Sequence, residues 1–402
     1  MITFADIEKA HERIRRQIYL SPFPYSESIS RLTDNKVYFK LENLQITGSF
    51  KERGALNKLL TLTPEQASRG VIAASAGNHG LAVAFHSRRL GIRSTIVMPV
   101  HAPLIKVSRV RQEGAETVLR GDDYDSAFAE AERLSTEKGY VFIHAFNDPA
   151  VIAGQGTLAL EMYQQNPDLD AVIVPVGGGG LIAGIALAFK KLNPKVQIIG
   201  VQSEALPSMK AALKTGHPVR VPPAATVADG IAVRAVGDIA YEIVQNLVNE
   251  IVTVSEGEIA NALLRLIEIE KTVAEGAAAV GLAALINNKL GLRGCAVGVV
   301  ISGGNIDVNL MSRIIEKGLI QDGRLSKFSV VLSDRPGSLA RLTDRIAELG
   351  ANILQISQTR GFGQIAIGET QVELTLETTG REHIEQICNG LTRDKFRFKT
   401  EA

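Results

Sequence analysis

The feature of the sequence that most restricts its fold is an alternation of short apolar runs and helical stretches over residues 1–320. The run "AVIVPV" (Ala171–Val176), for example, leads directly into "GGGG" and then into the helical stretch "LIAGIALAFKKL". Continuous β-branched runs are typical of parallel strands whose two faces are both covered by helices. We therefore expect an α/β fold with open, mostly parallel sheets and with ligands at the Gly-rich turns that follow the strands.

The pattern changes near residue 320. The stretch "KGLIQDGRLS" (Lys317–Ser326) is polar and contains Gly and Asp, which is typical of a linker. The remaining residues predict strand, helix, strand, strand, helix and strand, the βαββαβ order of a ferredoxin-like unit. We predict a large domain over residues 1–318 with a smaller subdomain over about 50–150, a linker over 319–326 and a second domain over 327–402.

Charge and cysteine content exclude several classes of function. The 44 basic and 43 acidic residues give a net charge of +1, so we expect no nucleic-acid partner. The cysteines, Cys295 and Cys388, lie far apart and match no metal-binding spacing. The N-terminal segment predicts an amphipathic helix without the apolar core of a signal peptide, and no apolar run is long enough to span a membrane. We therefore expect a cytoplasmic protein.

Four consecutive glycines in "PVGGGGLIAG" (Pro175–Gly184) predict an anion site. Glycines allow close approach to the backbone, and the following helix begins with free N–H groups, so a phosphate is the expected guest. The spacing is not that of a P-loop. A dinucleotide fingerprint fails because Ile182 stands where the third glycine is required, which disfavours an NAD-dependent oxidoreductase. A plain turn between strand and helix remains the alternative.

Two further turns carry polar residues at predicted strand ends. In "ASAGNHG" (Ala74–Gly80), Ser75 and Asn78 offer groups that bind a carboxylate or a ring hydroxyl, although an N-cap is the alternative. His79 in this turn is better explained by backbone hydrogen bonds than by catalysis. In "VVISGGNIDVN" (Val299–Asn309), the Ser302 hydroxyl is suited to a ring nitrogen, and a plain glycine turn is again the alternative.

Lys51 in "TGSFKERGA" (Thr47–Ala55) gains significance from these turns. Read alone, a lysine between apolar and charged neighbours is a solvated surface residue. Three Gly-containing strand ends and one lysine together fit a single ligand, a phosphorylated ring whose aldehyde forms an imine with lysine. That ligand is pyridoxal 5'-phosphate (PLP).

At this point a family resemblance becomes explicit. The chain resembles the PLP-dependent serine/threonine dehydratases of the tryptophan-synthase-β-like fold (fold type II), and among them the threonine ammonia-lyases. The matching segments cover most of residues 1–320 and are "TGSFKERGA", "SAGNHG", "HAFNDPAVIAGQGT", "PVGGGGLIAG" and "SGGNID". The C-terminal unit, with "DRPGSLARL" and "GANI", is similar to an ACT domain, a regulatory module that often binds amino acids.

The resemblance implies a role for individual residues. Lys51 would carry the cofactor and act as the catalytic base, Asn78 would bond the ring hydroxyl, and Ser302 would bond the pyridine nitrogen. The implied cofactor-binding residues are Phe50, Lys51, Asn78, Gly177, Gly178, Gly179, Gly180, Leu181, Glu275 and Ser302. The implied substrate-binding loop consists of Ser75, Ala76, Gly77 and His79.

The implied reaction is the deamination of L-threonine to 2-oxobutanoate and ammonia, and of L-serine to pyruvate. Serine racemase is an alternative, but the racemases carry a second serine where this chain has Ala76, and alanine has no exchangeable proton. A 3-hydroxyaspartate dehydratase is another alternative. A degenerate amino-acid sensor is a third, and the presence of Lys51 argues against it.

Metal binding and regulation complete the expectations. Some relatives bind a divalent cation with an acidic residue six positions after a glutamate, whereas here Glu204 is followed at that spacing by Lys210, so we expect no required metal. An ammonium at Lys210 could replace the cation; a solvated lysine is the alternative. Isoleucine or valine is the expected effector, framed by Asp334, Gly337 and Asn352, with a packing module as the alternative. We also expect a homo-oligomer, dimer or tetramer.

Overall fold

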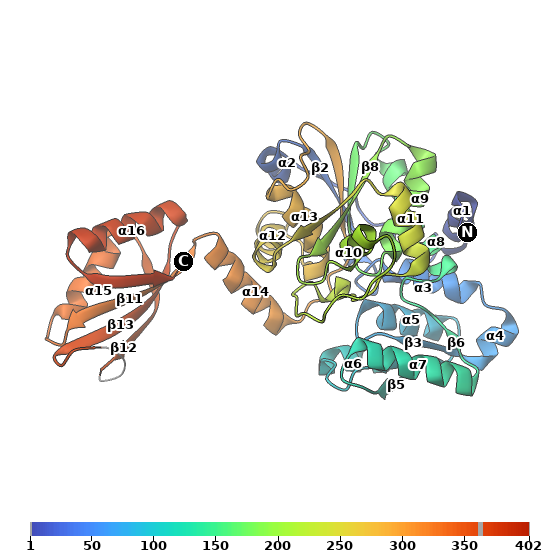
Figure 1. Ribbon diagram of the computed structural model, residues 1–402, viewed down its shortest axis with the longest axis horizontal. Helices are drawn as coiled ribbons and strands as arrows, with labels where there is room; N and C mark the ends of the chain where they lie inside the picture. The colour runs from blue at the N-terminus through green and yellow to red at the C-terminus, as the bar shows by residue number, and fades with distance from the viewer. Residues whose placement is uncertain (1, 361–364, 402) are drawn as a thin grey trace. The chain divides into compact units, whose positions relative to one another are not determined.

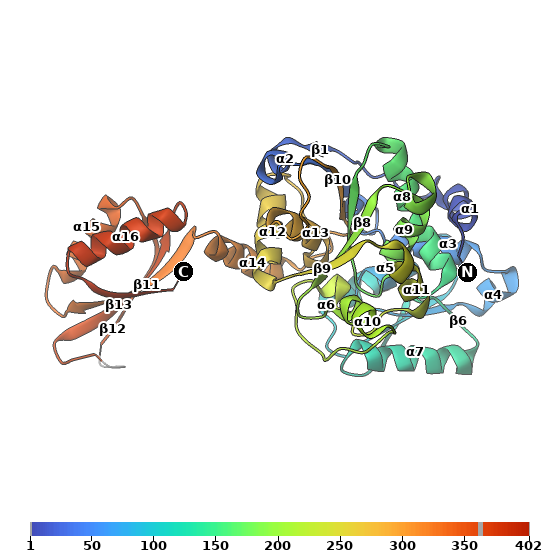
Figure 2. The same cartoon turned by 45° about the horizontal axis from the view of Figure 1, so that its top comes forward.

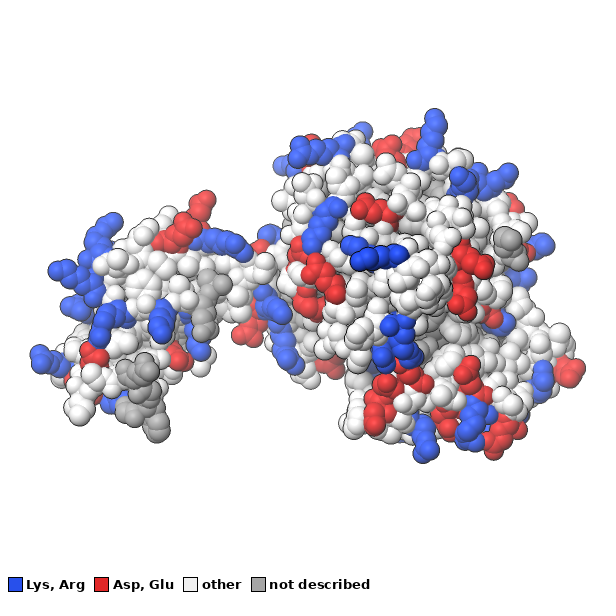
Figure 3. Space-filling view, viewed as in Figure 1, with Lys and Arg blue, Asp and Glu red and all other residues white. Residues whose placement is uncertain are grey.

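The computed structural model describes residues 2–360 and 365–401. The chain forms two compact units, residues 1–307 (unit 1) and residues 308–402 (unit 2), which are shown in Figure 1. In the described part of the chain, no helix is both long and apolar enough to cross a membrane. On the face seen in Figure 3, basic and acidic side chains of unit 1 are interspersed, as expected from the nearly balanced charge.

Unit 1 contains two sheets. The larger has the order β1 (Tyr25–Ser26), β2 (Lys36–Leu41), β10 (Ala296–Ile301), β7 (Ala171–Pro175), β8 (Gln197–Ser203) and β9 (Glu250–Val254). The smaller has the order β5 (Glu116–Leu119), β4 (Ser94–Met98), β3 (Val71–Ala74) and β6 (Val141–Phe142). Each pair of neighbours is parallel except β1 and β2. The predicted α/β class with mostly parallel sheets is confirmed.

Helices cover both sheets of unit 1. They are α1 (Phe4–Ile14), α2 (Glu27–Thr33), α3 (Lys51–Leu60), α4 (Pro64–Arg69), α5 (Asn78–Arg89), α6 (Leu104–Gln112), α7 (Tyr124–Lys138), α8 (Pro149–Gln165), α9 (Gly180–Leu192), α10 (Ser208–Thr215), α11 (Asp238–Leu247), α12 (Glu256–Glu268) and α13 (Gly276–Ile286). Short 3-10 helices lie at η1 (Glu42–Leu44) and η2 (Asp229–Ile231).

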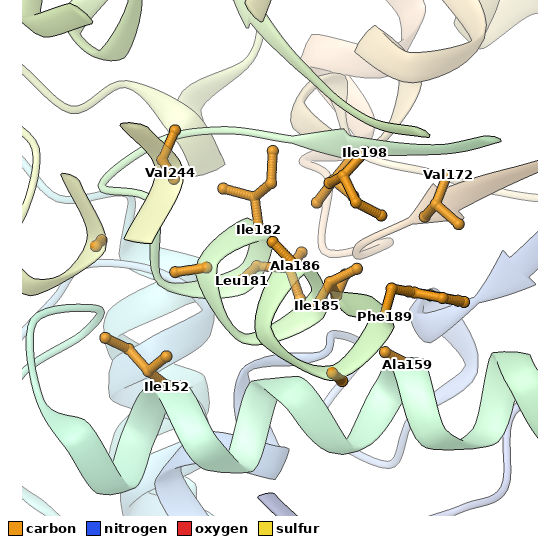
Figure 4. Packing of buried hydrophobic residues seen from close by; sticks show 14 of the residues in the cluster. Ile152, Ala159, Val172, Leu181, Ile182, Ile185, Ala186, Phe189, Ile198 and Val244 are labelled. Atoms are coloured by element: carbon orange, nitrogen blue, oxygen red, sulfur yellow. The ribbon is translucent and has the colours of Figure 1, made fainter. Parts of the chain in front are cut away.

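The two faces of the larger sheet pack against different helices. Val172 and Val174 of β7 join the core cluster of α1, α8, α9 and α11, part of which is shown in Figure 4. The intervening Ile173 lies against α13. A Cβ atom added at Gly281 of α13 would be 3.2 Å from the Cγ2 atom of Ile173. Figure 2 shows α12 and α13 on the side of this sheet opposite to α8 and α9. The uninterrupted apolar run in β7 is explained because both of its faces are buried.

The smaller sheet is also covered on both faces. Val71 and Ala73 pack in a cluster with α3, α5 and α6, whereas Ile72 and Ala74 pack against α7. Strand β3 therefore alternates between two apolar cores within four residues. Because all four strands are parallel, the loops after β3 and β4 emerge at the same edge of the sheet.

Local signals fix the start of α8, which later contributes to the site. Asp148 is its N-cap, and the carboxylate accepts hydrogen bonds from the backbone N–H groups of Ala150 and Val151 at 2.8 and 3.1 Å. Pro149 occupies the first helical position, where no N–H is required. Capping by an aspartate also places a negative charge at the positive end of the helix dipole.

After its first helix, unit 2 has the βαββαβ element order predicted from the sequence. It contains α14 (Val308–Gln321), β11 (Leu325–Ser333), α15 (Ser338–Glu348), β12 (Asn352–Thr359), β13 (Glu369–Glu377), α16 (Arg381–Arg393) and β14 (Arg397–Glu401). The strands form an antiparallel sheet in the order β12-β13-β11-β14, with α15 and α16 packed on one face. Helix α14 covers the first part of the predicted linker, so unit 2 begins before the expected boundary at residue 318.

Candidate active site

A cavity of about 270 Å³ lies in unit 1 where several parallel strands end. The loops after β3 and β7, the residue after β10 and the start of α3 all line it. The structure thus brings together all the residues predicted to bind cofactor or substrate. They are Phe50, Lys51, Ser75, Ala76, Gly77, Asn78, His79, Gly177, Gly178, Gly179, Gly180, Leu181, Glu275 and Ser302.

Lys51 is the first residue of α3 and its amine lies in the cavity wall. The Nζ atom donates a hydrogen bond to the carbonyl oxygen of Ala145 at 3.0 Å and lies 5.2 Å from the ring centre of Phe50. The preceding backbone is fixed because the Phe50 N–H donates to the carbonyl oxygen of Ser302 at 3.0 Å. The lysine is therefore held next to the end of β10.

The surroundings of Lys51 favour the neutral amine. Burial lowers the pKa of Lys51 to about 8, and the nearby Glu275 carboxylate limits this fall. A lysine whose pKa lies near neutrality can act both as a nucleophile and as a proton acceptor.

The four glycines form a cradle that side chains would fill. A Cβ atom at Gly178 would lie 2.3 Å from Cγ of Phe146, and one at Gly177 would lie 3.0 Å from Cα of Ile231. Gly179 has φ of +94°, a left-handed conformation, and directly precedes α9. The loop therefore presents backbone N–H groups and a helix N-terminus to the cavity, which suits a phosphate.

A polar chain crosses the cavity near Ser302. The Asn78 amide donates to both carboxylate oxygens of Glu275 at 2.9 Å, and its Oδ1 atom accepts a hydrogen bond from Asn305 at 2.9 Å. Arg109 of α6 in turn donates to Asn305 at 3.2 Å. Asn78 therefore lies in a fixed orientation with both ends of its amide engaged.

Glu275 is buried at the N-cap of α13. Burial and, to a smaller extent, the charge of Asp229 raise the pKa of Glu275 to about 7 against the opposing effect of the hydrogen bond from Asn78. Near neutral pH this carboxyl group exchanges between its charged and neutral forms. Glu275 can therefore accept or release a proton near neutral pH next to the Asn78 amide.

In the substrate loop, the side chain of His79 is held by the backbone and is not suited to acid–base catalysis. His79 is buried, and its Nε2 atom lies 2.8 Å from the carbonyl oxygen of Ile143. Burial and, to a smaller extent, the charge of Lys51 lower the pKa of His79 to about 3. This arrangement agrees with the interpretation of His79 as a turn histidine. Ser75 accepts a hydrogen bond from the Gly77 N–H at 3.2 Å, which shapes the loop.

Sequence reasoning missed several cavity residues. Lys106 of α6 and Asp229 form an ion pair of 2.7 Å between two cavity-lining side chains. Asn305, Tyr124 and Gln155 also line the cavity. Asn305 and Gln155 lie inside segments that resemble the family, so those segments could have drawn attention to them, whereas Lys106 and Asp229 lie in segments without such a signal.

The lysine ammonium next to Glu204 does not come from Lys210, as the sequence spacing suggested. The ammonium that reaches Glu204 belongs to Lys289, at 3.4 Å, and the same Nζ atom lies 2.8 Å from Glu258. The backbone N–H of Lys210 donates instead to Gln202 at 3.0 Å. In the described part of the chain, no group of three or more His, Cys, Asp or Glu residues is arranged to hold a metal ion.

The predicted effector residues of unit 2 are only partly brought together. Asp334 and Gly337 line a cavity of about 330 Å³ around the loop between β11 and α15. Arg360 also lines this cavity, and its Nε atom donates to Asp334 at 2.9 Å. Asn352 is not among the lining residues, and its amide donates to Glu377 at 3.0 Å.

Comparison with known proteins identifies the family. A family model described as "Pyridoxal-phosphate dependent enzyme" matches residues 14–303. The chain is 49% identical to the L-threonine ammonia-lyase of Thermotoga maritima over 387 residues, which are 96% of each chain. It is 46% identical to the L-threonine ammonia-lyase of Geobacter sulfurreducens over 97% of each chain.

Solved structures give the same result. The processed form of threonine deaminase isoform 2 from Solanum lycopersicum matches with a TM-score of 0.74 and 36% identity, covering 78% of this chain and 91% of that one. Maize serine racemase matches with a TM-score of 0.75 and 34% identity, covering 79% and 98%. The prediction of PLP as cofactor is confirmed, and the glycine cradle and the amine of Lys51 fit it. The chain belongs to the pyridoxal-phosphate dependent enzymes, in the family of the L-threonine ammonia-lyases.

Proposed function

We propose that this protein deaminates L-threonine to 2-oxobutanoate and ammonia, and L-serine to pyruvate. The observation that carries the proposal is the amine of Lys51, with a pKa of about 8, in the same cavity as the glycine cradle. The relatives named L-threonine ammonia-lyase, which match along nearly the whole chain, support threonine as the substrate.

Four groups of the chain would hold the cofactor. The backbone of Gly177–Gly180 and Leu181 would bind the phosphate, Lys51 the aldehyde carbon, Asn78 the ring hydroxyl and Ser302 the ring nitrogen. When bound, PLP supplies an electrophilic carbon and a conjugated ring that takes up the electron pair left after removal of the Cα proton.

Lys51 would move the Cα proton. Its depressed pKa leaves a substantial neutral fraction near pH 8, and the Ala145 carbonyl oxygen orients the nitrogen. Ser302 is a neutral hydroxyl at 2% exposure, so it accepts or donates a hydrogen bond without supplying a charge. A neutral partner at the ring nitrogen limits electron withdrawal. This would support loss of the β-hydroxyl over transamination.

The loop Ser75–His79 would receive the substrate carboxylate through its backbone N–H groups. It leads into the first turn of α5, with Gly77 as the N-cap, so the free N–H groups at this helix N-terminus form the positive end of the helix dipole. Ala76 lines the cavity without a hydroxyl group. Proton return to the opposite face of the substrate therefore lacks a donor at this position. This supports dehydration over the racemisation for which the structurally similar maize enzyme is named.

Unit 2 would regulate the enzyme as a ferredoxin-like ACT domain. Its βαββαβ order and the cavity beside Asp334 and Gly337 support an amino-acid effector site, with isoleucine or valine as the ligand. Gly337 has φ of +87° and is the N-cap of α15. Because glycine has no side chain to cap the helix, the N–H groups at the start of α15 would be free to bind a carboxylate. Asn352 is dropped from the proposed site because it lies outside the lining. A packing role in a homo-oligomer is the competing proposal.

An assay of 2-oxoacid release tests substrate and regulation together. The full-length protein loaded with PLP is given L-threonine and L-serine, with and without isoleucine and valine. We expect 2-oxobutanoate from threonine and a change in rate on adding the effector. D-serine as the main product from L-serine would instead support a racemase, and the absence of any turnover would leave the sensor hypothesis.

Substitution of Lys51 separates an enzyme from a sensor. We expect Lys51→Ala to lose the visible absorbance band of the lysine–PLP imine and to lower kcat by at least about 1,000-fold. Lys58→Ala, on the same helix but paired with Asp148 outside the cavity, is the matched control and should keep both properties. Turnover by Lys51→Ala near the unmodified rate would contradict the assigned role.

A further inference from the structure

Gln155 is a buried side chain of α8 that borders the active-site cavity and has a free donor. It is 1% exposed, and its Oε1 atom accepts a hydrogen bond from the Gly54 N–H of α3 at 3.2 Å. This bond fixes the orientation of the amide, because only the oxygen can accept from that N–H. The Nε2 atom has no hydrogen-bond partner among the described residues.

A buried donor without an acceptor is rare in a folded protein and requires an explanation. Here the side chain lines the cavity, so the missing acceptor can be an atom of whatever occupies the cavity. A residue needed only for packing would not require an amide with one unused end. The free Nε2 therefore indicates a ligand oxygen next to Gln155.

The position of Gln155 indicates which ligand oxygen this is. Its helix contacts α3 closely, since a Cβ at Gly54 would lie 2.4 Å from the Nε2 atom. One residue further on, α8 contacts α9, because a Cβ at Gly184 would lie 2.6 Å from the backbone nitrogen of Gly156. Figure 4 shows the Ile152 side chain of α8 on the side that faces α9. Gln155 thus lies where α8 meets the helix of Lys51 and the helix that follows the glycine cradle.

We propose that Gln155 is an additional phosphate ligand of this enzyme, with its Nε2 group donating to an oxygen of the cofactor phosphate. The inference rests on the proposed placement of the phosphate at Gly177–Gly180. Backbone N–H groups would supply the rest of the site, and Gln155 would supply a side-chain donor without adding charge. The same amide would join the start of the Lys51 helix, through Gly54, to the phosphate.

Two variants test the proposal in the full-length protein. Gln155→Glu keeps the shape and the acceptor for the Gly54 N–H but replaces the donor by an oxygen, and Gln155→Met removes both functions at similar volume. After removal of the cofactor, PLP or pyridoxal, which lacks the phosphate, is titrated back while the imine absorbance is followed. We expect the Kd for PLP to rise about 10- to 100-fold in Gln155→Met and further in Gln155→Glu. The Kd for pyridoxal should change by less than about threefold.

The same titrations with PLP and pyridoxal give the control and the results that would overturn the proposal. Gln164→Glu carries the same change at an exposed position of the same helix outside the cavity and should leave the Kd for PLP unchanged. An unchanged Kd for PLP in both Gln155 variants overturns the proposal, whether or not the KM for threonine rises. Equal losses for PLP and pyridoxal also overturn it, because they indicate a general structural defect. If the unmodified chain itself gave no imine band, the proposed function would fail, which is a different result.

Discussion

The two units of this chain stabilise their interiors in different ways. Unit 1 buries charged side chains beside its active site: Arg53 is fully buried and pairs with Glu42 and Glu161 at 2.7 Å each. Lys40, also fully buried, joins the same cluster through Glu161 at 2.7 Å. Unit 2 has an apolar core built from its strands and from α15 and α16.

The comparison shows that buried ion pairs, which cost hydration free energy, occur in unit 1 next to the helix of Lys51. A buried ion pair loses hydration and is seldom more stable than an apolar replacement. In unit 1 the charged cluster is attached to the first turn of the Lys51 helix, because Arg53 is two residues after Lys51 in α3. Four bonded ionic groups define one position for that turn, whereas an apolar contact tolerates small shifts. Unit 2 has no such lysine to place, and an apolar core is sufficient.

The largest expected effect that follows from this comparison is on stability. Arg53→Met removes the ion-pair partner of the buried Glu42 and leaves Glu161 paired with Lys40 alone, and it should lower the free energy of unfolding by about 3–5 kcal/mol. Urea unfolding followed by circular dichroism measures it. Arg133→Met, which removes exposed pairs on α7, is the control and should change stability by less than about 0.5 kcal/mol. Equal effects of the two changes would show that the buried cluster does not distinguish unit 1.

A truncation within unit 2 tests whether catalysis belongs to unit 1 and the response to an effector belongs to unit 2. Deletion of residues 323–402, which is the part of unit 2 after α14, should abolish the response to isoleucine or valine and leave kcat/KM for threonine within about threefold. The active-site cavity described above is lined by unit 1 residues only, which is the physical reason. Steady-state rates with and without effector provide the measurement. A truncated enzyme that still responds would place the effector site in unit 1.

A smaller effect is expected in the pH dependence of stability. The pKa of Glu275 is raised from 4.5 to about 7, so the folded state keeps a proton that the unfolded state releases between these values. The cofactor-free protein should therefore lose stability as the pH rises from about 4.5 to about 7. Glu275→Gln removes this contribution, and its unfolding free energy should fall less over that range. Urea titrations at several pH values would reveal the difference, and parallel pH profiles would refute it.

The smallest expected effect concerns reaction specificity. Ala76→Ser adds a hydroxyl to the loop that would bind the substrate carboxylate, and it should produce detectable D-serine from L-serine. Chiral chromatography of the products is the measurement. The change should leave the imine absorbance band intact, since Lys51 is untouched. A variant that forms no more D-serine than the unmodified enzyme would show that the missing hydroxyl does not set the outcome.

The sequence predicted the parallel α/β class because buried strands such as β7 are uninterrupted apolar runs. It predicted the cavity residues at Lys51, Gly177–Gly180 and Ser302 because three Gly-containing strand ends and one lysine together fit a single ligand, although each turn alone is also explained as a plain turn. Strand order could not be predicted, since it depends on which apolar faces meet. The end of α14 was expected to be linker because the stretch Lys317–Ser326 is polar and contains Gly and Asp.

Several site features depend on contacts between segments far apart in the chain. The ion pair between Lys106 and Asp229 joins α6 to a loop more than a hundred positions later, and neither residue has a local signal. The ammonium near Glu204 comes from Lys289 and not from the residue that sequence spacing selected. Sequence spacing identifies partners within a motif, but only the fold brings distant side chains together.

The glycine cradle has a consequence for how its function can be found by experiment. Alanine scanning identifies important residues by deleting atoms, but at Gly177–Gly180 every replacement adds them. An alanine at 178 would place its methyl group 2.3 Å from Cγ of Phe146, so the loop would be displaced before any hydrogen bond to it could be assessed. Loss of activity in such variants measures crowding, not recognition. Backbone amide-to-ester replacement, which removes single N–H groups and adds no bulk, is the informative chemistry for this part of the molecule.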